Sequence, residues 1–209
     1  MSSQDDTIGV NLAKAAKTDR EIHPLLAARW SPYVFDGRPV ERHNLLSCLE
    51  AARWAASSYN EQPWWFLMAE RGDSEEFARM LGCLMEANQA WAKNAGVLMI
   101  SVVCRTFSRN GKPNRVADHD VGLAAANLTV QATSLGLAVH QMAGVDLEKA
   151  RATYSIPDTH DPLTAIALGY AGETAKADEA LAQRDMAPRS RRAVSEFVFK
   201  GAWGKAGLF

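Results

Sequence analysis

Cysteine is scarce in this sequence, and its three copies follow no ligand spacing. Cys48, Cys83 and Cys104 are an odd number, lie far apart along the 209 residues and stand among apolar neighbours. This pattern provides neither a disulfide framework nor a set of metal ligands. We therefore expect three reduced, buried thiols and no metal site.

An excess of charge is absent too, since 23 basic residues face 24 acidic ones. No overall field then favours nucleic acid or an anionic membrane, and any anion site must be local. The longest apolar run, AGVLMISVVC, is about half a membrane span. The first residues, MSSQDDTIGV, lack the basic and apolar stretches of a signal peptide. We expect a cytoplasmic protein that binds neither nucleic acid nor membrane.

Several catalytic signatures are missing. There is no Ser-His-Asp set, no P-loop and no G-x-G-x-x-G, so hydrolysis by a nucleophile, phosphoryl transfer and Rossmann-type nicotinamide binding lack support. The run Asp118, His119, Asp120 suggests a metal or acid–base cluster, but neighbouring residues at a helix start point in different directions and favour helix capping. His140, in a strand pattern, is predicted to be a satisfied core or rim histidine.

The hydrophobic content of 47% is sufficient for a sizeable core, and the length suits one domain. No internal repeat interrupts an alternation of helix and strand patterns. The tail from residue 174 carries PRSRR before a last short helix. The pattern predicts two short helical pieces in 11–29 interrupted at Pro24, helices over 41–54, 74–85 and 118–135, and strands over 64–70, 96–104, 137–145 and 163–173. The longest helix has small residues (Gly122, Ala124, Ala125, Ala126) that allow another backbone to approach closely.

The stretch AASSYNEQPWWF, residues 55–66, combines hydrogen-bonding side chains with three aromatic rings. Ser57, Ser58, Asn60 and Gln62 would each need a partner if buried. A ligand with many polar edges would use all four. Core packing is the better interpretation for the aromatic residues that follow, and Gln62 can simply fix the entry to the strand.

Six motifs occur in the order found in the flavin-dependent nitroreductase family, which this chain resembles from about residue 23 onward. They are RWSPYVF, SSYNEQPWWF, D-x-G-L-A-A-A-N-L, GLAVHQMAGVD, ALGYAGE and PRSRR. The resemblance implies an α+β fold with a mixed, mainly antiparallel sheet flanked by helices. It also implies a homodimer that exchanges its C-terminal arms and holds two FMN molecules at the interface. The domain would span 23–209, after an N-terminal extension over 1–22.

The resemblance assigns a phosphate site to Arg29, Ser31, Arg189 and Arg191, with Trp30 also facing the cofactor. Planar guanidinium groups suit the dianionic phosphate of FMN. The alternative is that Arg29 caps a helix and that RSRR is a solvated surface run. Two matching clusters so far apart in the sequence favour the phosphate, with Arg192 left at the surface.

Other FMN contacts follow from the same resemblance. Ser57 and Ser58 would lie along the flavin of the partner's site, and Asn60 would face its ribityl chain. Asn88 would contact the pyrimidine end, although an exposed helix-surface asparagine is nearly as good an interpretation. Ala143 and Gly144 would present backbone N–H groups to the ring, and Asp146 would cap the next helix.

Two positions depart from the family pattern. Tyr33 and Trp91 stand where many members have a basic residue near the N1/C2 edge of the flavin. A missing cation predicts a lower reduction potential, unless Arg53 or a loop residue such as Arg109 replaces the charge. Tyr33 remains a predicted FMN contact.

The resemblance therefore predicts an FMN-dependent oxidoreductase with ping-pong kinetics. NAD(P)H would reduce the flavin, and an electron-poor nitroaromatic, quinone or activated alkene would reoxidise it. No catalytic acid or base is assigned. The alternatives are a flavin-binding storage or sensor protein with little turnover, and a same-fold enzyme that dehalogenates its substrate or degrades flavin.

Overall fold

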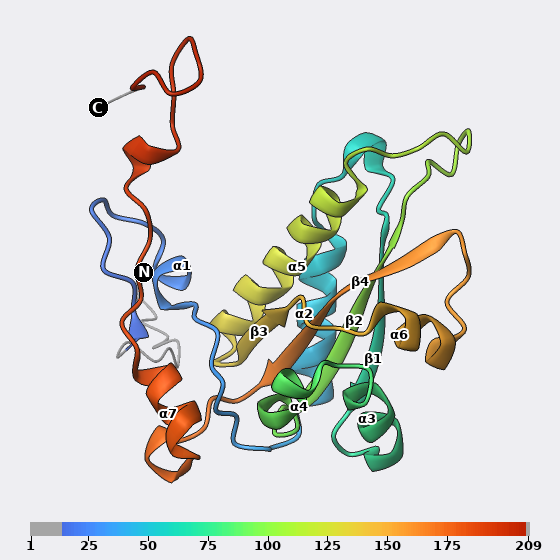
Figure 1. The fold of residues 1–209 in the computed structure, drawn as a ribbon, viewed down its shortest axis with the longest axis vertical. Coiled ribbons are helices and arrows are strands. Elements are labelled where there is room, and N and C mark those ends of the chain that lie inside the picture. The colour runs from blue at the N-terminus through green and yellow to red at the C-terminus, as the bar shows by residue number, and fades with distance from the viewer. Residues whose placement is uncertain (1–13, 208–209) are drawn as a thin grey trace, which may run out of the picture.

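A four-stranded antiparallel sheet forms the centre of the chain, as the computed structural model of residues 14–207 shows (Figure 1). Its spatial order is β1 (Trp64–Glu70), β2 (Val97–Cys104), β4 (His160–Gly169) and β3 (Ala138–Met142). All three ladders are antiparallel. The helices are α1 (Pro24–Ala28), α2 (Arg42–Arg53), α3 (Ser74–Leu81), α4 (Glu86–Ala92), α5 (Ala117–Ser134), α6 (Leu147–Tyr154) and α7 (Glu179–Met186). The predicted α+β fold and its four strands are confirmed.

The sheet is buried on both faces because β2 is apolar at every position except Ser101, whose hydroxyl hydrogen-bonds to Thr164. Val97 and Met99 pack with α2 and α5 on one face, while Leu98 and Ile100 pack with α3, α4 and α6 on the other. Side chains alternate across a strand, so a nearly continuous apolar run contributes to a core on each face of the sheet. Figure 1 shows the resulting three layers.

Helix α5 is the predicted long helix, and α2 packs along it. Ala124 and Ala125 are buried at this contact, and Asn127 Nδ2 donates to the Ala51 carbonyl at 3.2 Å. Gly122 and Ala126 are exposed, so only part of the small-residue set faces another element. Close approach of two backbones therefore depends on the buried alanines.

The N-terminal region differs from the prediction of two short helical pieces interrupted at Pro24. Pro24 does not interrupt a helix but begins α1, where its missing N–H costs nothing and its φ suits the helix. The residues before it, from 15 to 23, are irregular, and residues 1–13 lie outside the described part of the chain. The expected extension over 1–22 is therefore described only in its second half.

Helix α7 docks against the segment that follows α1. The buried carboxylate of Asp185 accepts hydrogen bonds from the N–H groups of Tyr33 at 2.7 Å and Val34 at 3.0 Å. In Figure 1, α7 and the C-terminal segment lie beside the N-terminal segment, to one side of the sheet. A distant part of the sequence therefore covers residues 29–34.

The C-terminal tail differs from the prediction. The helix α7 precedes PRSRR, and only a 3-10 turn, Val194–Glu196, follows it. Beyond it, Phe197 is 54% and Trp203 94% exposed, as an arm that packs on a partner would require. The predicted arm end, Phe209, lies outside the described residues.

The cysteine prediction holds for two of three residues. Cys48 and Cys83 are fully buried free thiols, and burial raises the pKa of Cys48 to about 12. Cys104 is only half-buried. Within residues 14–207 no group of three His, Cys, Asp or Glu side chains can hold a metal ion. No described helix is both long and apolar enough to cross a membrane.

Candidate functional site

A cluster of three arginines forms where the two ends of the described chain meet. Arg189 donates to the carbonyls of Ala27 at 3.1 Å and Arg29 at 2.8 Å, and Arg29 Nη1 lies 3.2 Å from Ser31 Oγ. Burial lowers the pKa of Arg29, and the positive charges of Arg189 and Arg191 lower it further. The three cations are therefore close enough to repel one another.

This cluster has no compensating carboxylate within residues 14–207, since none of its members forms an ion pair there. Repelling cations without an internal counterion suit an external anion. Both alternatives for these residues hold in part. The backbone N–H of Arg29 caps α1 by donating to Leu25 O at 3.0 Å, and the Arg191 side chain is exposed. In both cases the guanidinium groups keep N–H donors that can bind an anion.

Three aromatic rings continue the site from Ser31 toward the sheet. The ring of Tyr33 lies edge-on to Trp91 at 5.3 Å and to His140 at 4.7 Å between centroids, and Trp91 lies 4.4 Å from His140. His140 Nδ1 lies 2.8 Å from Pro32 O, so the predicted satisfied histidine is confirmed. The indole N–H of Trp91 is buried without a described partner. Burial lowers the pKa of His140, which makes this cluster neutral.

Asn88 contacts the turn after β3, which holds two other residues that the resemblance assigns to the flavin ring. Asn88 is half-buried and its Nδ2 donates to Gly144 O at 3.1 Å, so the exposed-asparagine alternative is wrong. A Cβ on Gly144 would lie 2.3 Å from Asn88 Nδ2, so any larger residue would force the Asn88 amide to move away from this turn. Asp146 caps α6 by accepting from Lys149 N at 2.9 Å, as predicted. Ala143 lies between β3 and this turn.

The polar turn at residues 57–62 is strained and lies apart from these clusters. Tyr59, Asn60 and Gln62 all have positive φ, between 54° and 56°, and such backbone strain often marks functional sites. The N–H of Ser58 donates to Asp120 Oδ2 at 3.0 Å, and Ser57 Oγ accepts from Gln62 N at 3.0 Å. No hydrogen bond in residues 14–207 joins this turn to the arginines.

The helix-capping prediction for residues 118–120 is wrong. Val116 is the N-cap of α5, with no side-chain capping bond. Asp118 instead pairs with Arg105 at 2.9 Å, and the buried Asp120 accepts from the Ser58 backbone. A carboxylate in the first turn of a helix can accept hydrogen bonds from a neighbouring loop instead of from its own helix. The sequence does not show which of these two partners it takes.

The expected replacement cations, Arg53 and Arg109, make other contacts within their own chain. Arg53 pairs with Glu50 in α2, and Arg109 stacks 4.0 Å over the Tyr59 ring. The cation that reaches Tyr33 is Arg184 of α7, whose Nη2 donates to Tyr33 Oη at 2.7 Å. Sequence reasoning missed Arg184 and Asp185, because 151 or 152 residues separate them from their partners.

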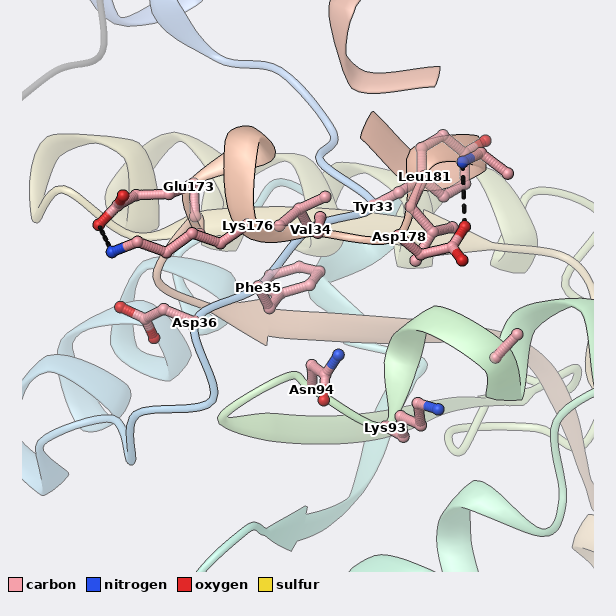
Figure 2. Close-up of a pocket in the computed structure, with 15 residues that line it drawn as sticks. Tyr33, Val34, Phe35, Asp36, Lys93, Asn94, Glu173, Lys176, Asp178 and Leu181 are labelled. Carbon is pink, nitrogen blue, oxygen red and sulfur yellow. Dashed lines mark hydrogen bonds and ion pairs between the residues drawn. The ribbon is translucent and has the colours of Figure 1, made fainter. Parts of the chain in front are cut away.

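A groove of about 910 Å³ adjoins Tyr33 on the side of α7. Figure 2 shows Phe35 at its centre, Asp178 and Leu181 on the α7 side, and Lys93 and Asn94 from the end of α4 opposite. Lys176 pairs with Glu173 at 2.9 Å along one wall. The groove has lining charges of both signs, so its chemistry favours no single class of ion. Trp30, the remaining predicted contact, is half-buried, and Lys14 Nζ lies 5.6 Å from its ring.

Comparison with known proteins identifies relatives that cover most of the chain. Residues 26–170 match the model of the nitroreductase family. The "Uncharacterized 15.4 kDa protein in ask 5'region" of Mycolicibacterium smegmatis is 38% identical over 146 residues, which are 66% of this chain and 97% of that protein.

Solved structures agree in fold. One described as an oxidoreductase containing FMN is 35% identical, with a TM-score of 0.85 over 90% of this chain and 96% of its own. A nitroreductase family protein from Clostridium difficile 630 is 22% identical, with a TM-score of 0.66 over 85% of this chain and 96% of its own. The family match covers well over half of the sequence. This chain therefore belongs to the nitroreductase family.

Proposed function

We propose that this protein is an FMN-dependent oxidoreductase that uses NAD(P)H to reduce an electron-poor acceptor. The observation that carries the proposal is the cluster of Arg29, Arg189 and Arg191, which has no described counterion. A dianionic phosphate at the end of a flexible chain matches this set of donors. A solved relative at 35% identity is described as containing FMN.

The remaining residues fit the rest of the cofactor. Ser31 stands next to the phosphate cluster, and Tyr33 and Trp91 offer ring surface beyond it. Asn88 keeps its side-chain carbonyl free of described donors and can accept from a ring N–H. Ala143 and Gly144 give backbone groups at the same end of α4.

The polar turn completes the site from a second copy of the chain. Ser57, Ser58 and Asn60 have hydrogen-bonding groups and a strained backbone, but lack contact with the arginines of their own chain. The exposed rings of Phe197 and Trp203 need cover, which a partner would supply. We therefore propose that the protein is a homodimer.

Bound FMN would supply the two-electron redox chemistry that links NAD(P)H to the second substrate. The chain binds the phosphate, orients the ring and excludes water from it. No described side chain is assigned as a catalytic acid or base. The acceptor would be a nitroaromatic, a quinone or an activated alkene.

The visible spectrum of the purified or FMN-reconstituted protein tests the cofactor. NADH and NADPH oxidation with a quinone then tests turnover, and parallel lines in double-reciprocal plots test the ping-pong order. A protein that binds no FMN contradicts the whole proposal. One that binds FMN but hardly consumes either nucleotide is the storage or sensor protein of the alternative.

The molecular mass in solution tests the dimer. Sedimentation or light scattering of the FMN-loaded protein should give twice the chain mass of 22.8 kDa. A monomer that retains FMN would show that the polar turn does not complete the site.

A further inference from the structure

Helix α7 places a positive charge directly on Tyr33. The guanidinium carbon of Arg184 lies 3.7 Å from the centre of the Tyr33 ring, and Nη2 donates to the phenol oxygen at 2.7 Å. A cation–π contact and a hydrogen bond therefore join the same two side chains. Tyr33 in turn touches Trp91 and His140.

The backbone fixes this position. Asp185, the neighbour of Arg184 in the sequence, is 3% exposed, and its two carboxylate oxygens accept hydrogen bonds from the N–H groups of Tyr33 and Val34. The oxygens of Asp185 therefore face the backbone and not the Arg184 guanidinium, although the negative charge of Asp185 acts on the same rings, since it raises the pKa of His140 while Arg184 lowers it. Among residues 14–207 Arg184 forms no ion pair, and its side chain is exposed.

Arg184 is distinct from the phosphate cluster. Residues 29–33 form an irregular stretch after α1 that ends in a bend at Tyr33. The arginine cluster lies at one end of this stretch and Tyr33 at the other. The aromatic partners of Tyr33 are Trp91 and a histidine whose pKa is lowered by burial. Arg184 is therefore the cation at the ring end.

We propose that Arg184 is a positioning residue that tunes the bound flavin through Tyr33. This rests on the proposed FMN function. Reduction adds negative charge to the isoalloxazine ring, and a nearby fixed cation stabilises that charge. Helix α7 thereby supplies the charge that position 33 itself lacks.

The donor roles support the assignment. The guanidinium has only donors, so it occupies a lone pair of the Tyr33 oxygen and leaves the phenol proton for another acceptor. A flavin carbonyl is such an acceptor. Because the guanidinium polarises the phenol, that hydrogen bond is stronger than one from an isolated tyrosine.

The reduction potential of FMN-loaded Arg184→Gln tests the inference. We expect a potential lower than that of the wild type by about 30 mV, which is tenfold in the equilibrium constant of a two-electron couple. Sulfite adds its sulfur lone pair to flavin N5 and leaves the ring electron-rich, so its affinity should also fall about tenfold. Arg184→Lys keeps the charge and should keep most of both values. Arg42→Gln, which removes an exposed arginine at the start of α2, should change neither.

The outcomes separate the two proposals. A wild type that binds no FMN overturns the proposed function. If FMN binds but Arg184→Gln keeps the wild-type potential and sulfite affinity, Arg184 does not tune the flavin. An equal fall in the lysine and glutamine variants also overturns the inference, because charge is then not the cause. Should the glutamine variant fail to fold, Arg184→Met, which keeps an unbranched stem over the ring, carries the same expectation.

Discussion

The guanidinium of Arg189 donates to the backbone carbonyl of Arg29 at 2.8 Å and joins two segments 160 residues apart. The bond uses the backbone of Arg29 and leaves its side chain beside Ser31. Arg189 thus supports the cluster, while Arg29 and Arg191 have more donors free for an anion. This division of roles leads to the first prediction.

Arg29→Ala and Arg191→Ala should each weaken FMN binding by roughly ten- to a hundredfold, the loss of a charged hydrogen-bonded contact of about 1.5–3 kcal/mol. Fluorescence titration of the apoprotein with FMN measures this. Arg192→Ala is the matched control and should bind normally. Wild-type affinity in both test variants would show that the phosphate lies elsewhere.

Asp185→Ala should lower the free energy of unfolding by about 3 kcal/mol. The buried carboxylate holds the N–H groups of Tyr33 and Val34, and both would lose their partner. Denaturant unfolding measures the change. Asp178→Ala in the same helix removes only an exposed cap to Ala180 N and should cost about 1 kcal/mol. Equal losses would mean that α7 is not anchored through Asp185.

Gly144→Ala should destabilise the apoprotein by about 0.5–1.5 kcal/mol and weaken FMN binding, because the added methyl group displaces the Asn88 amide and breaks its hydrogen bond to Gly144 O. Gly122→Ala has no atom within 4 Å of the new methyl group and should not destabilise α5. In an Asn88→Ala background the cost of Gly144→Ala should shrink, as a double-mutant cycle would measure. Additive losses would contradict the collision.

The protein should lose stability as the pH falls from 7.5 to 5.5, with His140 contributing to the slope. Burial lowers the pKa of this histidine most; Arg184 and Arg29 lower it further, against Pro32 O and Asp185, which raise it. The unfolded chain, with an ordinary pKa of about 6.5, then takes up the proton first. The contribution of His140 to the free energy of unfolding is fully present above that pH and is lost as the pH falls below it.

His140→Asn should flatten this dependence, because the amide can donate to Pro32 O but does not titrate. Free energies of unfolding at the two pH values, measured for both proteins, give the comparison. Parallel curves would place the titrating group elsewhere.

Much of the fold could be predicted because hydrophobic patterns within short segments indicate which residues form strands and which helix faces are buried. The nearly continuous apolar run of β2 requires burial on both faces, and the helical spacing of Leu45, Leu49 and Ala52 places one face of α2 inward, whereas Leu46, which the same period includes, is exposed. Pro24 was misinterpreted because proline both ends and begins helices, and only the tertiary course of the chain decides which.

The candidate site divides in the same way. The sequence by itself determined which residues have chemistry suited to a phosphate or a ring: Arg29, Tyr33, Asn88 and Gly144 among them. The side chains of Arg29, Tyr33 and Asn88, and the unhindered backbone of Gly144, carry that chemistry wherever they lie.

Only the tertiary structure decided which groups meet. Asp120 accepts a hydrogen bond from the N–H of Ser58, 62 residues away in the sequence, and Arg184 donates one to Tyr33, 151 residues away. Such contacts are selected by the packing of whole helices, whose energy is spread over many buried atoms, and not by any spacing within a short segment. A charge that the local sequence lacks at position 33 can therefore be restored by a helix near the other end of the chain.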